Sequence, residues 1–372
     1  MNSVNNKLFV SWTGLILGLA LSVVVIALHR RYFSDLSDVP GPFWASVTRL
    51  WHVWIILEGK QNLRLKALHR KHGQFVRIAP NEVSVCHPHG SALLLRANLQ
   101  KKKKAISKHF APGYALSQVL KKEPDVNKNI GYLLRWVEKH AEDRVPMDLD
   151  RFITYTTFDN IGSALFSEPF GFIRAARDIG GTLRNNVALS RFAAVAGFFI
   201  GPLRILINPL NSWLVFLPMG RLYRTTSNAI KKRLSNPEAH NDMVAHWLSA
   251  HEKSDTLSLR KIEAQANVNV GAGAEPVSSA IQSLLYHLIQ HPEAWLRVRN
   301  EIDAAKAEGS CLGRVVSYRD AEKLTYLRPC IKEALRMFSP TTMGLPRVVA
   351  KGGINIAGRH FQEGTILSIS PK

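Results

Sequence analysis

Cysteine and acidic residues are scarce in this sequence of 372 residues. Only three cysteines are present, and an odd, sparse set excludes the disulfide framework typical of small secreted proteins. Aspartate and glutamate together number 28 against 49 lysines and arginines, so the formal net charge is +21. Such an excess favours an acidic partner, namely an anionic membrane, an acidic protein or a nucleic acid. We disfavour nucleic acid, because the sequence has neither zinc-finger spacing nor an RNA-binding aromatic motif.

Long hydrophobic runs are also rare, and only one is long enough to cross a membrane. Leu8–Leu28 contains no charged residue and as a helix would be about 30 Å long, the thickness of a bilayer core. His29, Arg30 and Arg31 follow it against a single lysine before it, which predicts a single-pass anchor with the remaining chain in the cytosol. A cleaved signal peptide is the alternative, but its apolar region is normally shorter and ends at a small-residue cleavage site.

The rest of the chain reads as a folded protein, since 46% of all residues are hydrophobic. Pro40-Gly41-Pro42 predicts a stiff elbow after the anchor. Leu63–Gly73 then predicts an amphipathic helix closed by glycine, and Gln74–Pro88 predicts a β-hairpin from its alternating pattern around an Ala-Pro-Asn turn. Phe192–Gly220 is apolar but interrupted by prolines, so we expect a helix–loop–helix at the lipid interface rather than a second span.

The most informative segment is Asn267–Gln290, a helix-length apolar run with glycines and a proline near its centre. Gly271 and Gly273 lack side chains, so a flat ligand could approach the backbone closely. Pro276 has no amide hydrogen, which frees the Ala272 carbonyl and predicts a kink with a polar notch. A glycine-weakened core helix is the alternative for this segment taken alone.

Two polar residues of the same segment are candidates for chemistry. Glu275 adds a titratable group at the notch, and Ser278 is three residues later and so near the same helix face. A second pair, Glu333 and Arg336, has the same spacing and should form an ion pair. Such pairs are usually surface bridges of little consequence, so this one gains meaning only from its surroundings.

The sequences LPRVV and GGINIAGRHFQEGT follow at residues 345–349 and 352–365. Taken in order, these segments resemble the distal helix, the Glu-x-x-Arg helix and the following β-region of a cytochrome P-450. The resemblance covers essentially Leu8–Lys372, and the order of LHRKHG and VRIAPNEVSV is typical of fungal, microsomal members. It implies a mainly α fold with a small β-region behind the transmembrane helix. It also implies a haem-thiolate monooxygenase of the endoplasmic reticulum membrane that oxidises a lipophilic small molecule in specialised metabolism. Electrons would come from an NADPH-cytochrome reductase docked on the basic surface.

The resemblance assigns roles to individual positions. The cofactor-binding residues that it implies are Lys103, Ala272, Gly273 and Arg347. Lys103 and Arg347 would neutralise the haem propionates, with lysine standing where the family usually has arginine. Glu275 takes the place of the catalytic acid; proline replaces the usual alcohol, for which Ser278 is the candidate substitute. Glu333 and Arg336 would be a buried structural pair.

Two parts of the family pattern are missing. The loop that closes over the substrate is reduced to Asn98–Gln100, and no Phe-x-x-Gly-x-x-x-Cys sequence occurs before Lys372. We therefore expect residues 1–28 as an anchor, residues 29–44 as a hinge and residues 45–372 as an incomplete cytochrome P-450 domain that does not retain haem. The alternative function is a membrane-anchored remnant without catalysis. Cys86, His87 and His89 resemble a metal cluster, but we interpret them as a donor-rich turn and predict no metal site.

Overall fold

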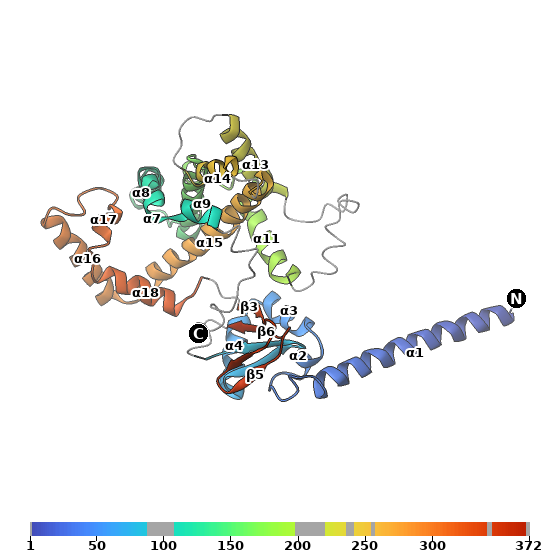
Figure 1. Ribbon diagram of the computed structural model, residues 1–372. Coiled ribbons are helices and arrows are strands. Elements are labelled where there is room, and N and C mark those ends of the chain that lie inside the picture. Colours follow the sequence, from blue (N-terminus) through green and yellow to red (C-terminus); the bar gives the residue numbers. More distant parts are fainter. Residues whose placement is uncertain are drawn as a thin grey trace. The chain divides into compact units, whose positions relative to one another are not determined.

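The computed structural model describes two units that are mainly helical with a small β-region (Figure 1). The described residues are 2–87, 108–197, 220–235, 242–253, 257–340 and 344–369. Unit 1 comprises the described parts of Met1–Leu99, Ala194–Leu203 and Thr342–Lys372, and unit 2 those of Gln100–Ala193 and Arg204–Thr341. Lys103, the shortened loop at Asn98–Gln100 and most of the apolar tract Phe192–Gly220 lie outside the described residues.

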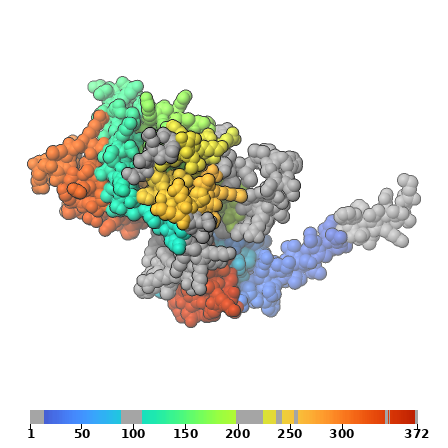
Figure 2. Space-filling model, turned by 45° about the horizontal axis from the view of Figure 1, so that its top comes forward, coloured from blue at the N-terminus to red at the C-terminus, as the bar shows by residue number. Residues whose placement is uncertain are grey.

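Unit 1 begins with helix α1, Asn2–Tyr32, which continues past Leu28 into the basic residues of its last turn. Among the residues that the structure describes, α1 is the one helix long and apolar enough to cross a membrane, judged by length and composition. Its large apolar side chains from Leu15 to Leu28 are exposed, and Figure 2 shows the coloured part of α1 extending away from the rest of unit 1. The basic last turn favourably opposes the partial negative charge of the helix C-terminus.

Three short helices and a sheet follow in unit 1. The helices are α2 (Phe43–Val47), α3 (Leu50–Leu57) and α4 (Gln61–His72). The sheet has the order β1-β2-β6-β3, with β1 at Phe75–Ala79, β2 at Glu82–Val85, β3 at Leu345–Val348 and β6 at Ile366–Ile369. Strands β4 (Ile354–Ile356) and β5 (Arg359–Phe361) form a separate hairpin. The predicted hairpin is present as the antiparallel pair β1–β2, and the predicted helix as α4, which ends before Gly73 in positive φ.

The junction between α1 and the sheet is held by a buried arginine, Arg77, which is only 1% exposed. Its guanidinium donates hydrogen bonds to the carbonyl oxygens of Arg30 at 2.7 Å and Pro80 at 2.6 Å. It also donates to the carbonyl of Leu36 at 3.2 Å and to Ser34 Oγ at 2.9 Å. Burial lowers the pKa of Arg77 to about 10, so the side chain stays charged at neutral pH.

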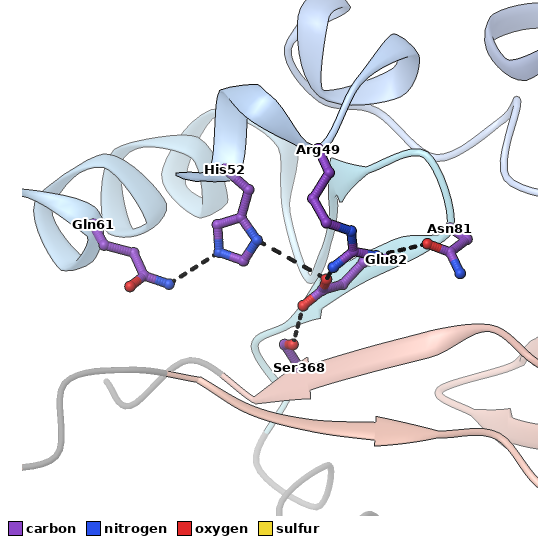
Figure 3. A network of polar contacts seen from close by, with 6 residues as sticks. All are labelled: Arg49, His52, Gln61, Asn81, Glu82 and Ser368. Carbon is purple, nitrogen blue, oxygen red and sulfur yellow. Dashed lines mark hydrogen bonds and ion pairs between the residues drawn. The ribbon is translucent and has the colours of Figure 1, made fainter. Parts of the chain in front are cut away.

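A second buried charge, Glu82 of β2, is the centre of a polar network (Figure 3). Its Oε2 accepts from Arg49 Nη1 at 2.5 Å, and its Oε1 accepts from Ser368 Oγ of β6 at 2.6 Å. His52 of α3 lies 3.9 Å from the same carboxylate and contacts Gln61 at 3.1 Å through its other ring nitrogen. Desolvation lowers the pKa of His52, so the imidazole is neutral at pH 7. The network joins α3, α4 and the parallel pair β2–β6.

Unit 2 is built from helices around one apolar core. Its longer helices are α8 (Glu123–Glu142), α9 (Leu149–Phe166), α11 (Thr182–Ala196), α13 (Gly220–Ser235), α14 (Met243–Glu252), α15 (Leu259–Gln290), α16 (Pro292–Ala307) and α18 (Leu327–Met337). Short turns of helix lie at Ala111–Tyr114 (η1), Leu116–Val119 (α7), Leu120–Lys122 (η2), Phe172–Ala175 (α10), Ile179–Gly181 (η3) and Tyr318–Ala321 (α17). Helix α9 packs along α15, and Figure 1 shows α15 running through the middle of the unit.

The apolar core of unit 2 accounts for the buried residues of α9. Phe158, Leu165 and the indole of Trp247 from α14 are buried with the apolar residues of α15. Asp159 beside Phe158 is fully buried and accepts hydrogen bonds from the amides of Gly171, Phe172 and Ile173. Burial raises the pKa of this carboxyl, although the three amide donors oppose the shift. The Phe-Asp pair therefore fixes the first turn of α10.

Candidate functional site

Helix α15 has two opposite faces that run along its whole N-terminal half. Residues at four-residue intervals from Ile262 to Ser278 are buried against the core of unit 2. On the other face Val268 is 58% exposed and Ala272 is also exposed. The small side chain of Ala272 lies on this exposed face.

Gly273, the other predicted cofactor residue on this helix, faces a different direction. A Cβ atom at this position would lie 3.3 Å from Ile161 Cδ1 of α9, which is tighter than ordinary packing. The glycine therefore permits the close approach of α9 and α15. Its role in the structure is helix packing, and the exposed face belongs to Ala272.

The predicted acid, Glu275, points toward α11. Its Oε1 accepts from Asn186 Nδ2 at 2.8 Å and its Oε2 accepts from Ser190 Oγ at 3.5 Å. Asn186 is 1% exposed and also donates to the Gly271 carbonyl at 3.1 Å, so one amide bridges two turns of α15. Both partners of the carboxylate are neutral. Asn186 is a residue that sequence reasoning missed, because nothing local to α11 indicates which helix it meets.

The predicted alcohol, Ser278, points toward α9. It is 2% exposed and its Oγ lies 2.9 Å from Thr154 Oγ1. It also accepts from Gln282 Nε2 at 2.8 Å, and the same amide donates to Asp150 Oδ1 at 2.6 Å. Ser278 is thus part of a polar contact between α9 and α15.

Glu275 and Ser278 line one cleft of about 870 Å³, bounded by α9, α11 and α15. Its apolar wall includes Phe158, Leu183 and Val187, and its charged residues are Asp148, Asp150, Arg151, Arg177, Asp178, Arg184, Arg191 and Glu275. The two predicted catalytic residues share the cleft without a hydrogen bond between them, since each is held by a different neighbouring helix. The structure therefore does not assemble an acid–alcohol pair.

Arg347, the predicted propionate ligand that the structure describes, lies on β3 of unit 1. Its backbone pairs with Leu367 of β6, and its Nη1 donates to the Pro346 carbonyl at 3.0 Å. It has no acidic partner among the described residues. The guanidinium is half-buried and remains available for an anion.

Glu333 and Arg336 form a bidentate ion pair on α18, with Nε to Oε2 at 2.8 Å and Nη2 to Oε1 at 2.6 Å. The family resemblance implied a buried pair, but the two side chains are 58% and 66% exposed. The pair is exposed because no other described segment covers this face of α18. Arg336 lowers the pKa of the Glu333 carboxyl through these hydrogen bonds.

The residues present do not fit a thiolate-ligated haem. Ala272 is exposed on α15, but a haem iron of this type also needs a sulfur donor. Cys311 is buried, Cys330 lies within the regular helix α18, and Cys86 follows β2. Cys311 lies in a loop between Gly309 and Gly313, but its side chain is buried, and neither Cys86 nor Cys330 lies in a glycine-rich loop that would present sulfur to a metal. Among the residues that the structure describes, no group of three His, Cys, Asp or Glu side chains could hold a metal ion.

The sequence comparisons identify the family. The family model described as Cytochrome P450 matches residues 15–372. Cytochrome P450 monooxygenase ABA2 of Pyricularia oryzae is 26% identical, with 95% of this chain and 75% of the relative covered. Cytochrome P450 monooxygenase hepC of Aspergillus oryzae is 27% identical, covering 96% and 78%. A pisatin demethylase of Fusarium vanettenii is 25% identical, covering 92% and 72%. With a match over nearly its whole length, this chain belongs to the cytochrome P450 family.

Proposed function

We propose that this protein belongs to a branch of the family that oxidises a lipophilic small molecule in fungal specialised metabolism. The relatives that support this proposal are monooxygenases and a demethylase of filamentous fungi. Residues 1–28 anchor the chain in the endoplasmic reticulum membrane, residues 29–44 form the hinge, and the remainder is cytosolic. The net charge of +21 favours docking of an acidic electron donor such as an NADPH-cytochrome reductase.

We further propose that the polypeptide of these 372 residues does not itself carry out the oxidation. The observation that carries this proposal is the placement of the three cysteines, none of which is presented as an iron ligand. Ala272 and Arg347 remain positions where a haem would be contacted, but without a sulfur donor the chain should bind haem weakly. Glu275 would then act only as a hydrogen-bond acceptor between α11 and α15.

Haem content tests this proposal. We expect the chain purified from membranes of a haem-supplemented host to contain far less than one haem per polypeptide. Cys330→Ser should leave that content unchanged, because Cys330 is not a ligand. Pyridine haemochrome absorbance against protein concentration gives the ratio. One haem per chain, lost in Cys330→Ser or in the matched variant Cys86→Ser, would show that an existing cysteine binds the iron.

A second candidate function is a non-catalytic, membrane-tethered protein that binds lipid or a partner enzyme. It is favoured by the apolar helix α1 and by the apolar side chains that unit 1 exposes next to it. Both this candidate and the proposed inactivity of the 372-residue chain predict no reductase-dependent oxidation of NADPH above the reductase background. Oxidation above that background would contradict both and support an active monooxygenase.

A further inference from the structure

The cleft of unit 2 is lined by one face of α9 and one face of α11, with α15 beside them. The lining residues are Asp150, Arg151, Thr154, Tyr155 and Phe158 on α9, and Leu183, Arg184, Val187, Ser190 and Arg191 on α11. Most of these positions recur at intervals of three or four residues, which is the repeat of a single helix face. A volume of about 870 Å³ lies within the range of sites for small organic molecules, roughly 300–1,000 Å³.

The inner wall of this cleft is apolar. Phe158 and Tyr155 of α9 are buried in the core of unit 2, and Leu183 and Ala176 pack against the same core. Val187 lies one turn after Leu183 on α11 and is 46% exposed although it is apolar. A molecule that fills the cleft therefore gains most by placing an apolar body against this wall.

The carboxylates that line the cleft already accept hydrogen bonds from the protein. Asp148 accepts from a backbone amide in the first turn of α9, at 3.3 Å. Asp178 accepts from two backbone amides in the first turn of α11, at 3.0 and 3.2 Å. Asp150 and Glu275 each accept from a side-chain amide, at 2.6 and 2.8 Å. All four acids therefore have a role in holding the helices together.

The arginines that line the cleft are held less firmly. Arg151 and Arg184 form ion pairs of 3.4 and 3.6 Å with the acids that cap their own helices, but their side chains are 62% and 87% exposed. Such exposed pairs contribute little. Arg177 and Arg191 are exposed and make no hydrogen bond or ion pair with any residue that the structure describes. The cleft therefore offers free guanidinium groups and no free carboxylate, which favours an anion.

We propose that this cleft binds an amphipathic organic acid. Its apolar body lies against Phe158 and Val187, and its carboxylate or sulfonate meets the guanidinium groups of Arg177 and Arg191, which match the planar geometry of such anions. The site goes beyond the proposed function because it requires no iron. Ala272, the position of α15 where a haem would be contacted, is not among the lining residues of the cleft.

Photolabelling of the full chain in detergent, without haem or reductase, tests the proposal. The probe is para-benzoylbenzoic acid, an aromatic carboxylate whose ketone attaches to neighbouring C–H bonds under near-ultraviolet light. Para-benzoylbenzamide has the same shape without the charge and is the matched control compound. Peptide mapping by mass spectrometry locates the attached probe, so labelling of the apolar helix α1 is counted separately from labelling of the cleft.

Three variants accompany the probe. Arg177→Gln combined with Arg191→Gln removes the two free charges at exposed positions, where substitution does not disturb packing. Arg174→Gln is the matched control, because Arg174 is an exposed arginine of α10 that does not line the cleft. Val187→Trp fills the cleft from an exposed position on α11. Amide hydrogen exchange in α9 checks that each variant is folded.

We expect the acid to label peptides of α9 and α11 about tenfold more than the amide does, since a hydrogen bond to a charged group is worth at least that factor. The double arginine variant and Val187→Trp should lose this excess, and Arg174→Gln should keep it. Equal labelling by the two compounds, or an equal loss in Arg174→Gln, would overturn the proposal. Labelling that persists in Val187→Trp would also overturn it, because the acid would then bind elsewhere. None of these results depends on whether the chain oxidises a substrate.

Discussion

Replacing Arg77 with methionine is expected to weaken unit 1 by about 3–5 kcal/mol, because three carbonyl groups and Ser34 Oγ lose their donor inside the protein. Methionine has nearly the length of the apolar part of the arginine side chain and leaves no large cavity. The loss of stability therefore measures the contribution of the guanidinium hydrogen bonds. Since 1.4 kcal/mol is a tenfold change, amide protection in β1 and β2 should fall by about 2 to 3.5 orders of magnitude. Hydrogen exchange with peptide resolution on the chain in detergent measures it.

Arg70→Met is the matched control for this substitution. Arg70 is an exposed arginine of α4 for which no hydrogen bond or ion pair is found among the described residues, so its replacement should change stability by less than about 0.5 kcal/mol. Equal protection of β1 in the two variants would show that the Arg77 hydrogen bonds do not hold the junction. Faster exchange at residues 30–36 in the Arg77 variant alone would confirm that the guanidinium ties the end of α1 to the sheet.

Glu82→Gln is expected to cost about 3 kcal/mol, since it removes the carboxylate that faces Arg49 and lies near His52 (Figure 3). This cost lies at the lower end of the range for breaking a buried ion pair, because the Arg49 side chain is 18% exposed and keeps part of its hydration. The glutamine oxygen still accepts from Ser368, so the strand contact is preserved while the charge is lost. Proteolysis in increasing urea measures the population of opened unit 1.

Ser368→Ala is the comparison for Glu82→Gln. It removes a single hydrogen bond from the same carboxylate and should cost about 1 kcal/mol. If Glu82→Gln loses no more free energy of unfolding than Ser368→Ala, the negative charge of Glu82 contributes nothing to stability. The hydrogen bond between β2 and β6 would then account for the stabilisation by this network.

The local elements of this fold were predictable because their signals lie within a few residues of one another. The hairpin β1–β2 follows from alternation around Ala79-Pro80-Asn81, and the end of α4 follows from Gly73 in a positive φ. The single apolar helix near the N-terminus follows from length and hydropathy alone. Family membership followed from the order of motifs, which the match over residues 15–372 confirms.

The interior of the sheet was not predictable from the same alternation. In β2 the pattern places Glu82 and Ser84 on the polar side, where solvent is expected. Both are buried, since Ser368 and Arg49 satisfy Glu82, and His69 of α4 contacts Ser84 at 2.8 Å. Ser368 is 286 positions away from Glu82 in the sequence. No local signal specifies a pairing over that distance.

The candidate site was predicted in part for a similar reason. The i, i+3 spacing of Glu275 and Ser278 places them on neighbouring sides of α15, and both do line one cleft. Their side chains nevertheless diverge, because Asn186 attracts the carboxylate and Thr154 the hydroxyl. Spacing along one helix indicates which side a residue faces, whereas its hydrogen-bond partner depends on the helices that pack there.

We propose that this chain has the fold of the family but that none of its three cysteines presents sulfur to iron. The reduced carbon-monoxide difference spectrum of the purified 372-residue chain tests it most directly, because the band position depends on whether the axial ligand is a thiolate. We predict that the thiolate-type Soret band is absent, both in the unmodified chain and in Cys330→Ser. A thiolate-type band of the intensity expected for one haem per chain would contradict the account.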